Sequence, residues 1–198
     1  MNTTQQTLNK IFKNPEQDLL MFDDLSKIDI YEKDEGKFYI KAISKMDEEK
    51  KVYDAKTGKG APEEIVRQLY LVKLTKYYKY PKDLIELEKH VNFGREIKRA
   101  DIVVYRPDGI TPKIIIEVKA PNQENDVQQL KSYLNAEGAP VGVAVNGKAR
   151  LILYRPYPKD FDDTLDDIPA SDEEVEDVLA KRKTLNDLRE DDLKETIK

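Results

Sequence analysis

The chain of 198 residues contains no cysteine and only one histidine, His90. The lack of cysteine excludes a disulfide framework, a thiol nucleophile and a cysteine-based zinc site. The lack of a second histidine excludes every nuclease or hydrolase that depends on a histidine pair. We expect His90 to be an ordinary solvated residue.

Long apolar runs are also missing. No segment approaches the roughly 18 consecutive apolar residues of a membrane span, and the N-terminus has no apolar signal region. We therefore expect a soluble, cytoplasmic protein with no membrane partner. The length suits one domain with appendages, and a hydrophobic content of 39%, with eleven tyrosines and five phenylalanines, is enough for a core.

The strong basic charge that would by itself indicate a nucleic-acid-binding protein is absent. The net charge of the chain is −5, but residues 158–198 alone carry 15 acidic and 7 basic side chains. Residues 1–157 hold 27 basic and 24 acidic side chains, a net charge of +3. A mildly basic body is compatible with DNA but does not argue for it unaided.

A phosphate-binding loop is missing too. Residues 56–60 contain Gly58, Lys59 and Gly60, but they do not have the spacing G-x-x-x-x-G-K-[ST], and we expect no strand before them. The sequence therefore predicts no ATP site in this chain.

Hydrophobic periodicity predicts the main elements. Alternating residues at 27–31 and 37–41 indicate a β-hairpin. Pro62, followed by two acids, begins a helix that ends at Tyr80-Pro81. Further strands are expected at residues 84–90, 100–105, 114–119, 141–145 and 149–154, with a helix over residues 124–135. The order strand, helix, strand implies that residues 114–119 and 141–145 pair in parallel.

We divide the chain into three parts. Residues 1–51 are an N-terminal extension with the β-hairpin, residues 52–157 are the core, and residues 158–198 are an acidic linker and a C-terminal helix. We expect the acidic run at residues 160–177 to be solvated. The helix, over residues 172–194, would dock through Val175, Val178, Leu179, Leu185 and Leu188.

The tripeptide Glu117-Val118-Lys119 is the strongest chemical signal. Glu-x-Lys occurs five times in this chain, but only this copy ends an unbroken aliphatic run, which is typical of a strand buried on both faces. Side chains alternate along a strand, so Glu117 and Lys119 share one face. Two carboxylates from neighbouring strands, with a lysine beside them, would suit a magnesium-dependent phosphodiester hydrolase.

Asp101, at the head of the preceding strand, is the second carboxylate. If the chain folds back about Gly109, Asp101 lies opposite Glu117; if it folds back about Ile110, Asp101 lies opposite Lys119. A centre half a residue away would point Asp101 to the other face, because a slip of one residue reverses every side chain. The sequence permits the first two registers but does not fix them.

Each of the two core helices carries a polar pair four residues apart beside its apolar stripe. Gln129 and Tyr133 flank the stripe of the second helix. Glu63 and Arg67 in the first helix could form a surface ion pair. Alternatively, Glu63 could reach over the sheet towards the metal.

Five motifs follow one another along the chain: Pro62-Glu63-Glu64-x-Val66-Arg67-Gln68, Ala100-Asp101-Ile102-Val103-Val104-Tyr105, Ile116-Glu117-Val118-Lys119-Ala120-Pro121, Gln129-x-x-x-Tyr133 and Asn146-Gly147. This ordered set, within residues 52–154, resembles the N-terminal domain of type I restriction enzyme R proteins, which belongs to the PD-(D/E)xK nuclease superfamily. The resemblance implies an α/β, restriction endonuclease-like core, with a central mixed β-sheet flanked by helices in the order helix, three strands, helix, strand. Ala100 replaces the proline of the superfamily's name.

The resemblance also assigns the main site residues. It implies that Asp101 and Glu117 bind the metal, that Lys119 is the catalytic lysine and that Glu63 is the acid of the first helix. Glu64 competes with Glu63 for this last role, and the four-residue spacing to Arg67 favours Glu63.

Supporting roles follow from the same resemblance. Arg67 would orient Glu63, and the carbonyl of Val118 would join the metal ligands. Gln129 and Tyr133 would order the site or engage DNA. The cofactor would be one or two Mg²⁺ ions.

The implied activity is that of a Mg²⁺-dependent DNA endonuclease acting on double-stranded DNA, alone or with the specificity, methylase or motor subunits of a restriction system. Alternatively, the chain keeps the fold but depends on a partner for DNA engagement and cuts little by itself. It could be a fragment or a short relative of the restriction subunit that lacks the motor.

Overall fold

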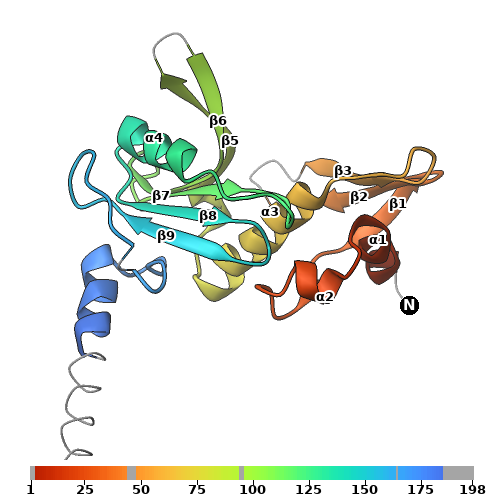
Figure 1. Cartoon of the computed structure of the whole chain (residues 1–198), viewed down its shortest axis with the longest axis horizontal. Helices are drawn as coiled ribbons and strands as arrows, with labels where there is room; N and C mark the ends of the chain where they lie inside the picture. The colour runs from red at the N-terminus through yellow and green to blue at the C-terminus, as the bar shows by residue number, and fades with distance from the viewer. Residues whose placement is uncertain (1–2, 44–47, 94–95, 164, 185–198) are drawn as a thin grey trace, which may run out of the picture.

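The computed structural model describes residues 3–43, 48–93, 96–163 and 165–184. These residues form an α/β protein with two β-sheets (Figure 1). None of the helices they form is long and apolar enough to cross a membrane. The elements are α1 (Thr3–Ile11), α2 (Pro15–Asp18), η1 (Leu25–Lys27), β1 (Ile30–Asp34), β2 (Lys37–Lys41), β3 (Glu49–Asp54), β4 (Lys59–Gly60), α3 (Pro62–Val72), η2 (Lys73–Tyr77), η3 (Lys82–Leu84), β5 (Ile85–Phe93), β6 (Glu96–Tyr105), β7 (Pro112–Val118), α4 (Val127–Glu137), β8 (Val141–Val145) and β9 (Arg150–Tyr154).

The first sheet is antiparallel, in the order β1-β2-β3-β4. The expected hairpin is confirmed as β1 and β2, although its first strand begins later than expected, at Ile30. Strands β3 and β4 extend the sheet to Gly60, past the boundary expected at residue 51. The expectation that no strand precedes the loop at residues 56–60 is therefore wrong. Charged residues dominate β3 and leave Val52 as its only fully buried side chain, so the strand has no clear alternating pattern.

The second sheet has the order β5-β6-β7-β8-β9. Strands β5, β6 and β7 are antiparallel neighbours, β7 and β8 run parallel, and β9 returns antiparallel to β8. The predicted parallel pairing is therefore confirmed. The order α3, β5, β6, β7, α4, β8 also matches the predicted order of helix, three strands, helix and strand.

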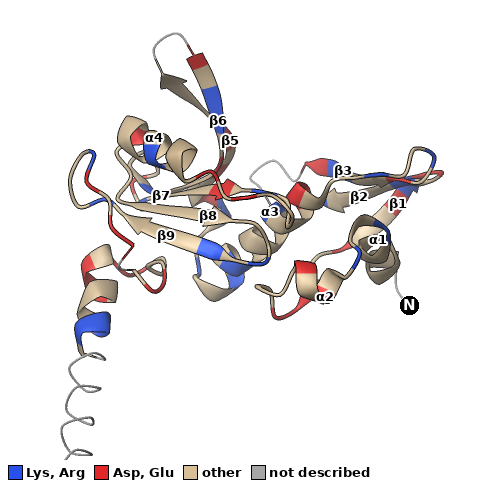
Figure 2. Cartoon of the chain, in the orientation of Figure 1, with Lys and Arg blue, Asp and Glu red and all other residues tan. Residues whose placement is uncertain are grey.

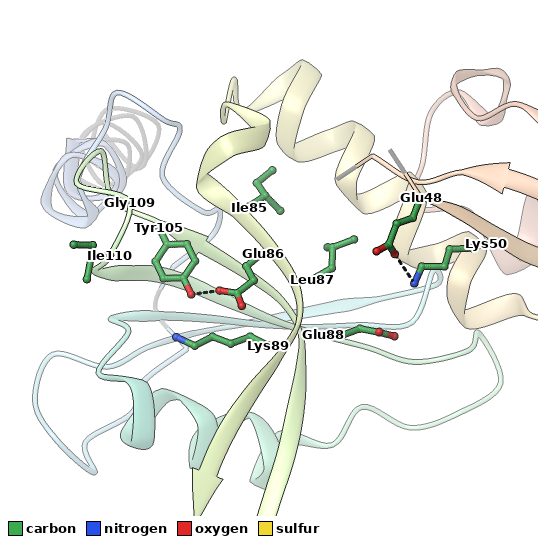
Figure 3. Close-up of a pocket in the computed structure, with 10 residues that line it drawn as sticks. All are labelled: Glu48, Lys50, Ile85, Glu86, Leu87, Glu88, Lys89, Tyr105, Gly109 and Ile110. Carbon is green, nitrogen blue, oxygen red and sulfur yellow. Dashed lines mark hydrogen bonds and ion pairs between the residues drawn. The ribbon is translucent and has the colours of Figure 1, made fainter. Parts of the chain in front are cut away.

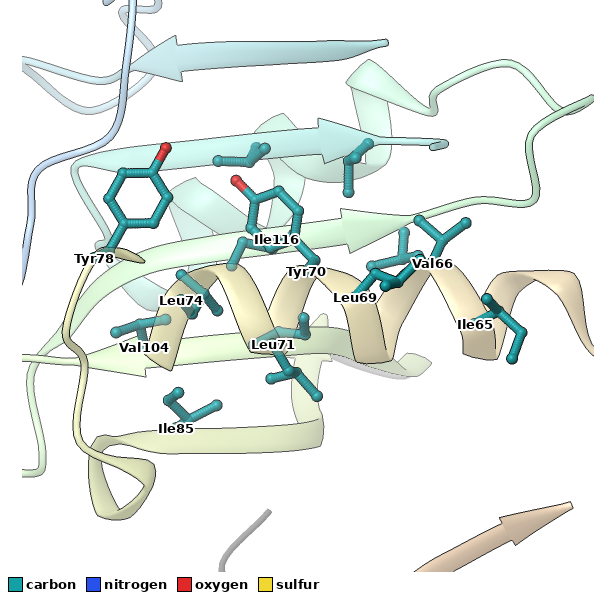
Figure 4. Packing of buried hydrophobic residues seen from close by; sticks show 14 of the residues in the cluster. Ile65, Val66, Leu69, Tyr70, Leu71, Leu74, Tyr78, Ile85, Val104 and Ile116 are labelled. Carbon is teal, nitrogen blue, oxygen red and sulfur yellow. The ribbon is translucent and has the colours of Figure 1, made fainter. Parts of the chain in front are cut away.

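The two core helices cover opposite faces of this sheet. Ile114 and Ile116 of β7 pack in the same hydrophobic cluster as α3, whose packing Figure 4 shows. Ile115, which points the other way, packs in the cluster of α4. By the same alternation Glu117 lies on the face of α4, at the end of a strand that is buried on both sides.

The C-terminal segment differs from its expectation. Residues 165–170 are not a solvated linker, because Leu165 and Ile168 are buried in the core. The hydroxyl of Tyr80 donates a hydrogen bond of 2.8 Å to the carbonyl oxygen of Pro169. The buried ammonium of Lys113 donates one of 3.2 Å to the carbonyl oxygen of Ala170. A few apolar residues among many acids give no periodic signal, so only the tertiary contacts reveal the packing.

A C-terminal helix is present over residues 175–184, starting later than expected. Val175 is buried in the core, and Val178 and Leu179 pack against it, as predicted. Leu185 and Leu188, also expected to dock, lie outside the described residues. The described part of the helix therefore packs through three of the five residues named for it.

Candidate active site

Asp101 and Glu117 lie opposite each other on one face of the sheet. Strand β6 pairs with β7 through Ile102 and Ile116, so the next pair towards the end of β7 is Asp101 and Glu117. The fold-back is centred on Gly109, which takes a left-handed φ of 70°. The structure therefore adopts the first of the two registers that bring the acids together. The carboxylate oxygen Oδ2 of Asp101 accepts a hydrogen bond of 2.8 Å from the backbone N–H of Val118.

Glu117 is the most deeply buried acid of the site, with 2% of its surface exposed. Lys119 Nζ donates a hydrogen bond of 2.7 Å to its Oε1. Its other oxygen, Oε2, is buried and has no hydrogen-bond partner among the described residues. Burial, and after it the charge of Asp101, raises the pKa of Glu117 to about 7. Burying a carboxylate oxygen without a partner is costly, so this oxygen is the atom of the site that most needs a cation or a hydrogen-bond donor.

Arg67 joins helix α3 to this pair of acids. Its Nη2 donates a hydrogen bond of 2.6 Å to Asp101 Oδ1, and its Nη1 donates one of 2.7 Å to Glu64 Oε2. Its distance to Glu63 Oε1 is longer, 3.6 Å. Arg67 therefore holds Asp101 and Glu64 more directly than it holds Glu63.

The positions of the two helix acids differ. Glu64 also accepts a hydrogen bond of 2.8 Å from Gln68 Nε2, so both of its oxygens are engaged, and Glu64 does not line the cavity beside Asp101 and Glu117. Glu63 lines the cavity, and burial together with the charge of Asp101 raises its pKa. Of the two acids, Glu63 is the one that faces the site.

These residues line a cavity of about 430 Å³. Its walls are Glu63, Arg67, Glu88, Lys98, Arg99, Asp101, Glu117, Lys119, Gln129 and Tyr133. Every side chain that the sequence singled out for the site is therefore present, from α3, β6, the end of β7 and α4. Val118 contributes only its backbone, because its side chain is buried on the opposite face.

Gln129 and Tyr133 form a short hydrogen-bond chain at the wall of the cavity. Gln129 Nε2 donates to the hydroxyl of Tyr133 at 2.8 Å. That hydroxyl in turn donates to the backbone carbonyl oxygen of Arg99 at 2.8 Å. The pair thus fixes the position of β6 relative to α4.

Glu88, Lys98 and Arg99 line the cavity but were not predicted. Glu88 has a left-handed φ of 51°. It lies opposite Asp101, because its neighbours in β5 pair with Ile102 and Ala100. Its carboxylate is 3.5 Å from Arg67 Nη1 and 3.6 Å from Arg99 Nη1. No sequence signal distinguishes Glu88 from its neighbours, since only the strand pairing places it opposite Asp101.

A larger cavity, of about 670 Å³, lies along the outer side of β5 (Figure 3). Its acids have partners of their own: Glu48 pairs with Lys50 at 3.0 Å, and Glu86 accepts a hydrogen bond from the hydroxyl of Tyr105. No residue predicted for the site lines it. The smaller cavity is therefore the better candidate for chemistry.

Among the residues that the structure describes, no group of three or more His, Cys, Asp or Glu side chains is placed to hold a metal ion. Glu63 therefore does not join Asp101 and Glu117 as a third carboxylate ligand in this arrangement. Mg²⁺ is usually bound by one or two carboxylates, with water and substrate phosphate completing its shell. Asp101 and the free oxygen of Glu117 fit that pattern.

The fold and the site together define an α/β domain with a charged cavity, whose acids Asp101 and Glu117 lie beside Lys119 at the end of a buried strand. The family model of the type I restriction enzyme R protein N terminus (HSDR_N) matches residues 62–169, more than half of the chain. The chain therefore belongs to this family, and the predicted resemblance is confirmed. The match covers the second sheet and the whole cavity. No curated protein and no solved structure gives a significant match.

The raised pKa of Glu117 predicts how stability depends on pH. Between its ordinary value of 4.5 and about 7, the folded protein holds a proton that the unfolded chain has lost. The free energy of unfolding should therefore decrease as the pH rises through this window. We expect a lower Tm at pH 7.5 than at pH 5.5 in EDTA, and a smaller decrease in Glu117→Gln. Equal decreases in the two proteins would show that Glu117 is not responsible.

Proposed function

We propose that this chain is a Mg²⁺-dependent DNA endonuclease domain with a restriction endonuclease-like core. The observation that carries the proposal is the pair of opposed carboxylates, Asp101 and Glu117, with an unpartnered buried oxygen on Glu117 and Lys119 hydrogen-bonded beside it. Membership of a restriction-enzyme family supports DNA as the substrate.

In this proposal Asp101, Glu117 and the carbonyl of Val118 hold the metal ion, and Glu63 contributes from the cavity wall through water. The bound ion would polarise the phosphate and lower the pKa of a water molecule. Burial lowers the pKa of Lys119, but the hydrogen bond to Glu117 outweighs it and the pKa is raised overall, so this side chain remains an ammonium. It would donate a hydrogen bond to the attacking oxygen.

The remaining residues position the catalytic groups. Arg67 fixes Asp101 by donating a hydrogen bond to its Oδ1. A carboxylate oxygen has further lone pairs, so Asp101 can still bind a metal ion. Gln129 and Tyr133 hold β6 in place. No ATP chemistry is proposed, so any translocation would need a motor supplied by another domain or subunit.

A second function is favoured by the close contact between Arg67 and Asp101. Both oxygens of Asp101 already accept hydrogen bonds, from Arg67 and from the N–H of Val118. A chain in which both oxygens of Asp101 are already engaged would be a partner-dependent DNA-binding or assembly module that cuts little alone. Specificity, methylase or motor subunits of a restriction system would then complete the site.

A plasmid-nicking assay with Mg²⁺ separates the two functions. We expect the wild type to nick and Asp101→Ala, Glu117→Ala and Lys119→Ala to lose this activity. Glu174→Ala is a matched control, because Glu174 forms an ion pair of 2.7 Å with Arg106, away from the cavity. Unchanged cleavage in all three variants would contradict the site. Absence of both cleavage and Mg²⁺ binding in the wild type would favour the partner-dependent module.

A further inference from the structure

Strands β5 and β6 extend beyond the rest of the second sheet (Figure 1). The pairing of β6 with β7 covers only Ile102 to Tyr105, whereas its pairing with β5 continues to Glu96. Residues 88–93 and 96–101 therefore form a two-stranded projection, which we call the β5–β6 arm. The arm leaves the sheet at Asp101, which is the position of the candidate site.

Where the arm begins, the buried side chains of β6 change from one face of the sheet to the other. Ile102 packs in the cluster of α3, but Ala100, two residues before it, packs in the cluster of α4. In a regular strand these two residues would share a face. The left-handed backbone of Glu88, opposite Asp101, accompanies this switch. Lys98 and Arg99, next along this strand of the arm, both lie at the wall of the cavity.

Lys98 and Arg99 are weakly engaged within the protein. Their side chains are 50% and 60% exposed. Lys98 lies 4.0 Å from Glu96, and Arg99 lies 3.6 Å from Glu88, both beyond hydrogen-bond distance. Lys98 Nζ also lies 5.9 Å from the centre of the Phe93 ring, a weak contact for an exposed cation. Figure 2 shows the basic residues of the arm between its acidic end and the sheet. The arm therefore presents two available cations beside a cavity whose other charged groups are mostly acidic.

Helix α4 fixes this part of the arm. The hydroxyl of Tyr133 donates to the carbonyl oxygen of Arg99, and Gln129 donates to that hydroxyl. The ring of Phe93, on the other strand of the arm, lies 5.7 Å from the ring of Tyr133. These contacts set the arm's position relative to Glu117, so its cations are preorganised beside the site.

We propose that the β5–β6 arm binds the DNA backbone, with Lys98 and Arg99 contacting phosphates that flank the one in the cavity. Tyr133 acts as a positioning residue for Arg99. This inference rests on the proposed nuclease function and names the surface that engages its substrate. Without Lys98 and Arg99 the cavity lining would hold four acids and two bases, an excess that repels a polyanion, and the two cations of the arm offset that repulsion.

The test measures the affinity of the full chain for a fluorescent DNA duplex in EDTA at several salt concentrations. We expect the double variant Lys98→Gln/Arg99→Gln to bind about tenfold more weakly and to reduce the slope of log K against log salt by about 2, since each phosphate contact contributes roughly one unit. Lys56→Gln/Lys59→Gln, the same charge change at two exposed residues in the turn between β3 and β4 and at the start of β4, should bind like the wild type. Equal affinity and slope in the wild type and the arm variant would overturn the proposal.

Tyr133→Phe tests the positioning role. It removes the hydrogen bond to the carbonyl of Arg99 and retains both cations, so we expect weaker binding with an unchanged salt slope. Unchanged affinity would overturn the positioning role. Thermal unfolding checks that each variant is folded, and the shift of Tm by Mg²⁺ should be the same in the arm variant and the wild type.

The two proposals fail in different ways. A wild type that binds DNA through the arm but does not nick contradicts the nuclease function alone. A wild type that nicks, with an arm variant that binds DNA equally well, contradicts the arm alone.

Discussion

Glu117→Gln is expected to abolish nicking and, at the same time, to stabilise the metal-free protein above pH 7. Glutamine retains the size of the side chain but cannot supply the negative charge for a cation. Loss of metal assistance, which supplies several kcal/mol, should reduce the nicking rate by at least about 10³-fold. The buried carboxylate, whose pKa is raised to about 7, destabilises the folded state when it ionises. Its removal should raise the free energy of unfolding by about 2 kcal/mol at pH 8.

The opposite changes in activity and stability make this prediction specific. The rate is measured by plasmid nicking at saturating Mg²⁺, and the free energy by chemical denaturation in EDTA. Glu174→Gln, which replaces an ion-paired carboxylate outside the cavity, should leave the nicking rate unchanged. If Glu117→Gln were active, or if it were clearly less stable than the wild type at pH 8, Glu117 would be a structural residue.

Arg67→Met is expected to be the most destabilising single change at the site. Only 7% of Arg67 is exposed, and its guanidinium donates hydrogen bonds to Asp101 and Glu64, whose side chains are 14% and 12% exposed. Methionine would leave both acids partly buried without their cation. Removing one partner of a buried charge pair costs about 3–5 kcal/mol. For a protein of this size, a loss of about 3 kcal/mol lowers Tm by on the order of 10 °C.

Two variants test this explanation of the loss. Lys27→Met removes a cation from an exposed ion pair with Asp24, at 3.1 Å, and should leave Tm unchanged. Arg67→Met/Glu64→Gln removes one of the two uncompensated acids and should recover part of the lost stability. A double variant as unstable as Arg67→Met would show that packing, and not charge, dominates at this position.

The second sheet was largely predictable because its pattern is local. Unbroken aliphatic runs ending in Glu117 and Val145, the alternation of polar and apolar residues in the helices, and the turn at Gly109 each depend on neighbouring residues. Buried strands need such runs because both faces lie against helices. The ordered motifs then identified the family, and through it the seven side chains of the expected site.

Other parts of the structure were not predictable from local patterns. Strand β3 is hidden by its charged residues, and residues 165–170, although Leu165, Ile168 and Pro169 are buried, have no periodic pattern. Glu88 gave no signal, because its place in the cavity wall depends on strand pairing and on a left-handed backbone opposite Asp101. Lys98 and Arg99 became relevant only once the β5–β6 arm was seen to pass the cavity.

The sequence by itself pointed to Glu117 and Lys119, because an acid and a lysine at the end of a buried strand are a local pattern, but it gave no signal for Glu88, Lys98 or Arg99 in the same cavity. Only the tertiary structure decided that Asp101 faces Glu117, since the sequence left the register open and a slip of one residue would have turned it away. It also decided that Arg67 contacts Asp101, which lies 34 residues further along the chain. Such contacts depend on how strands and helices meet in space, and that arrangement is set by burial over the whole core.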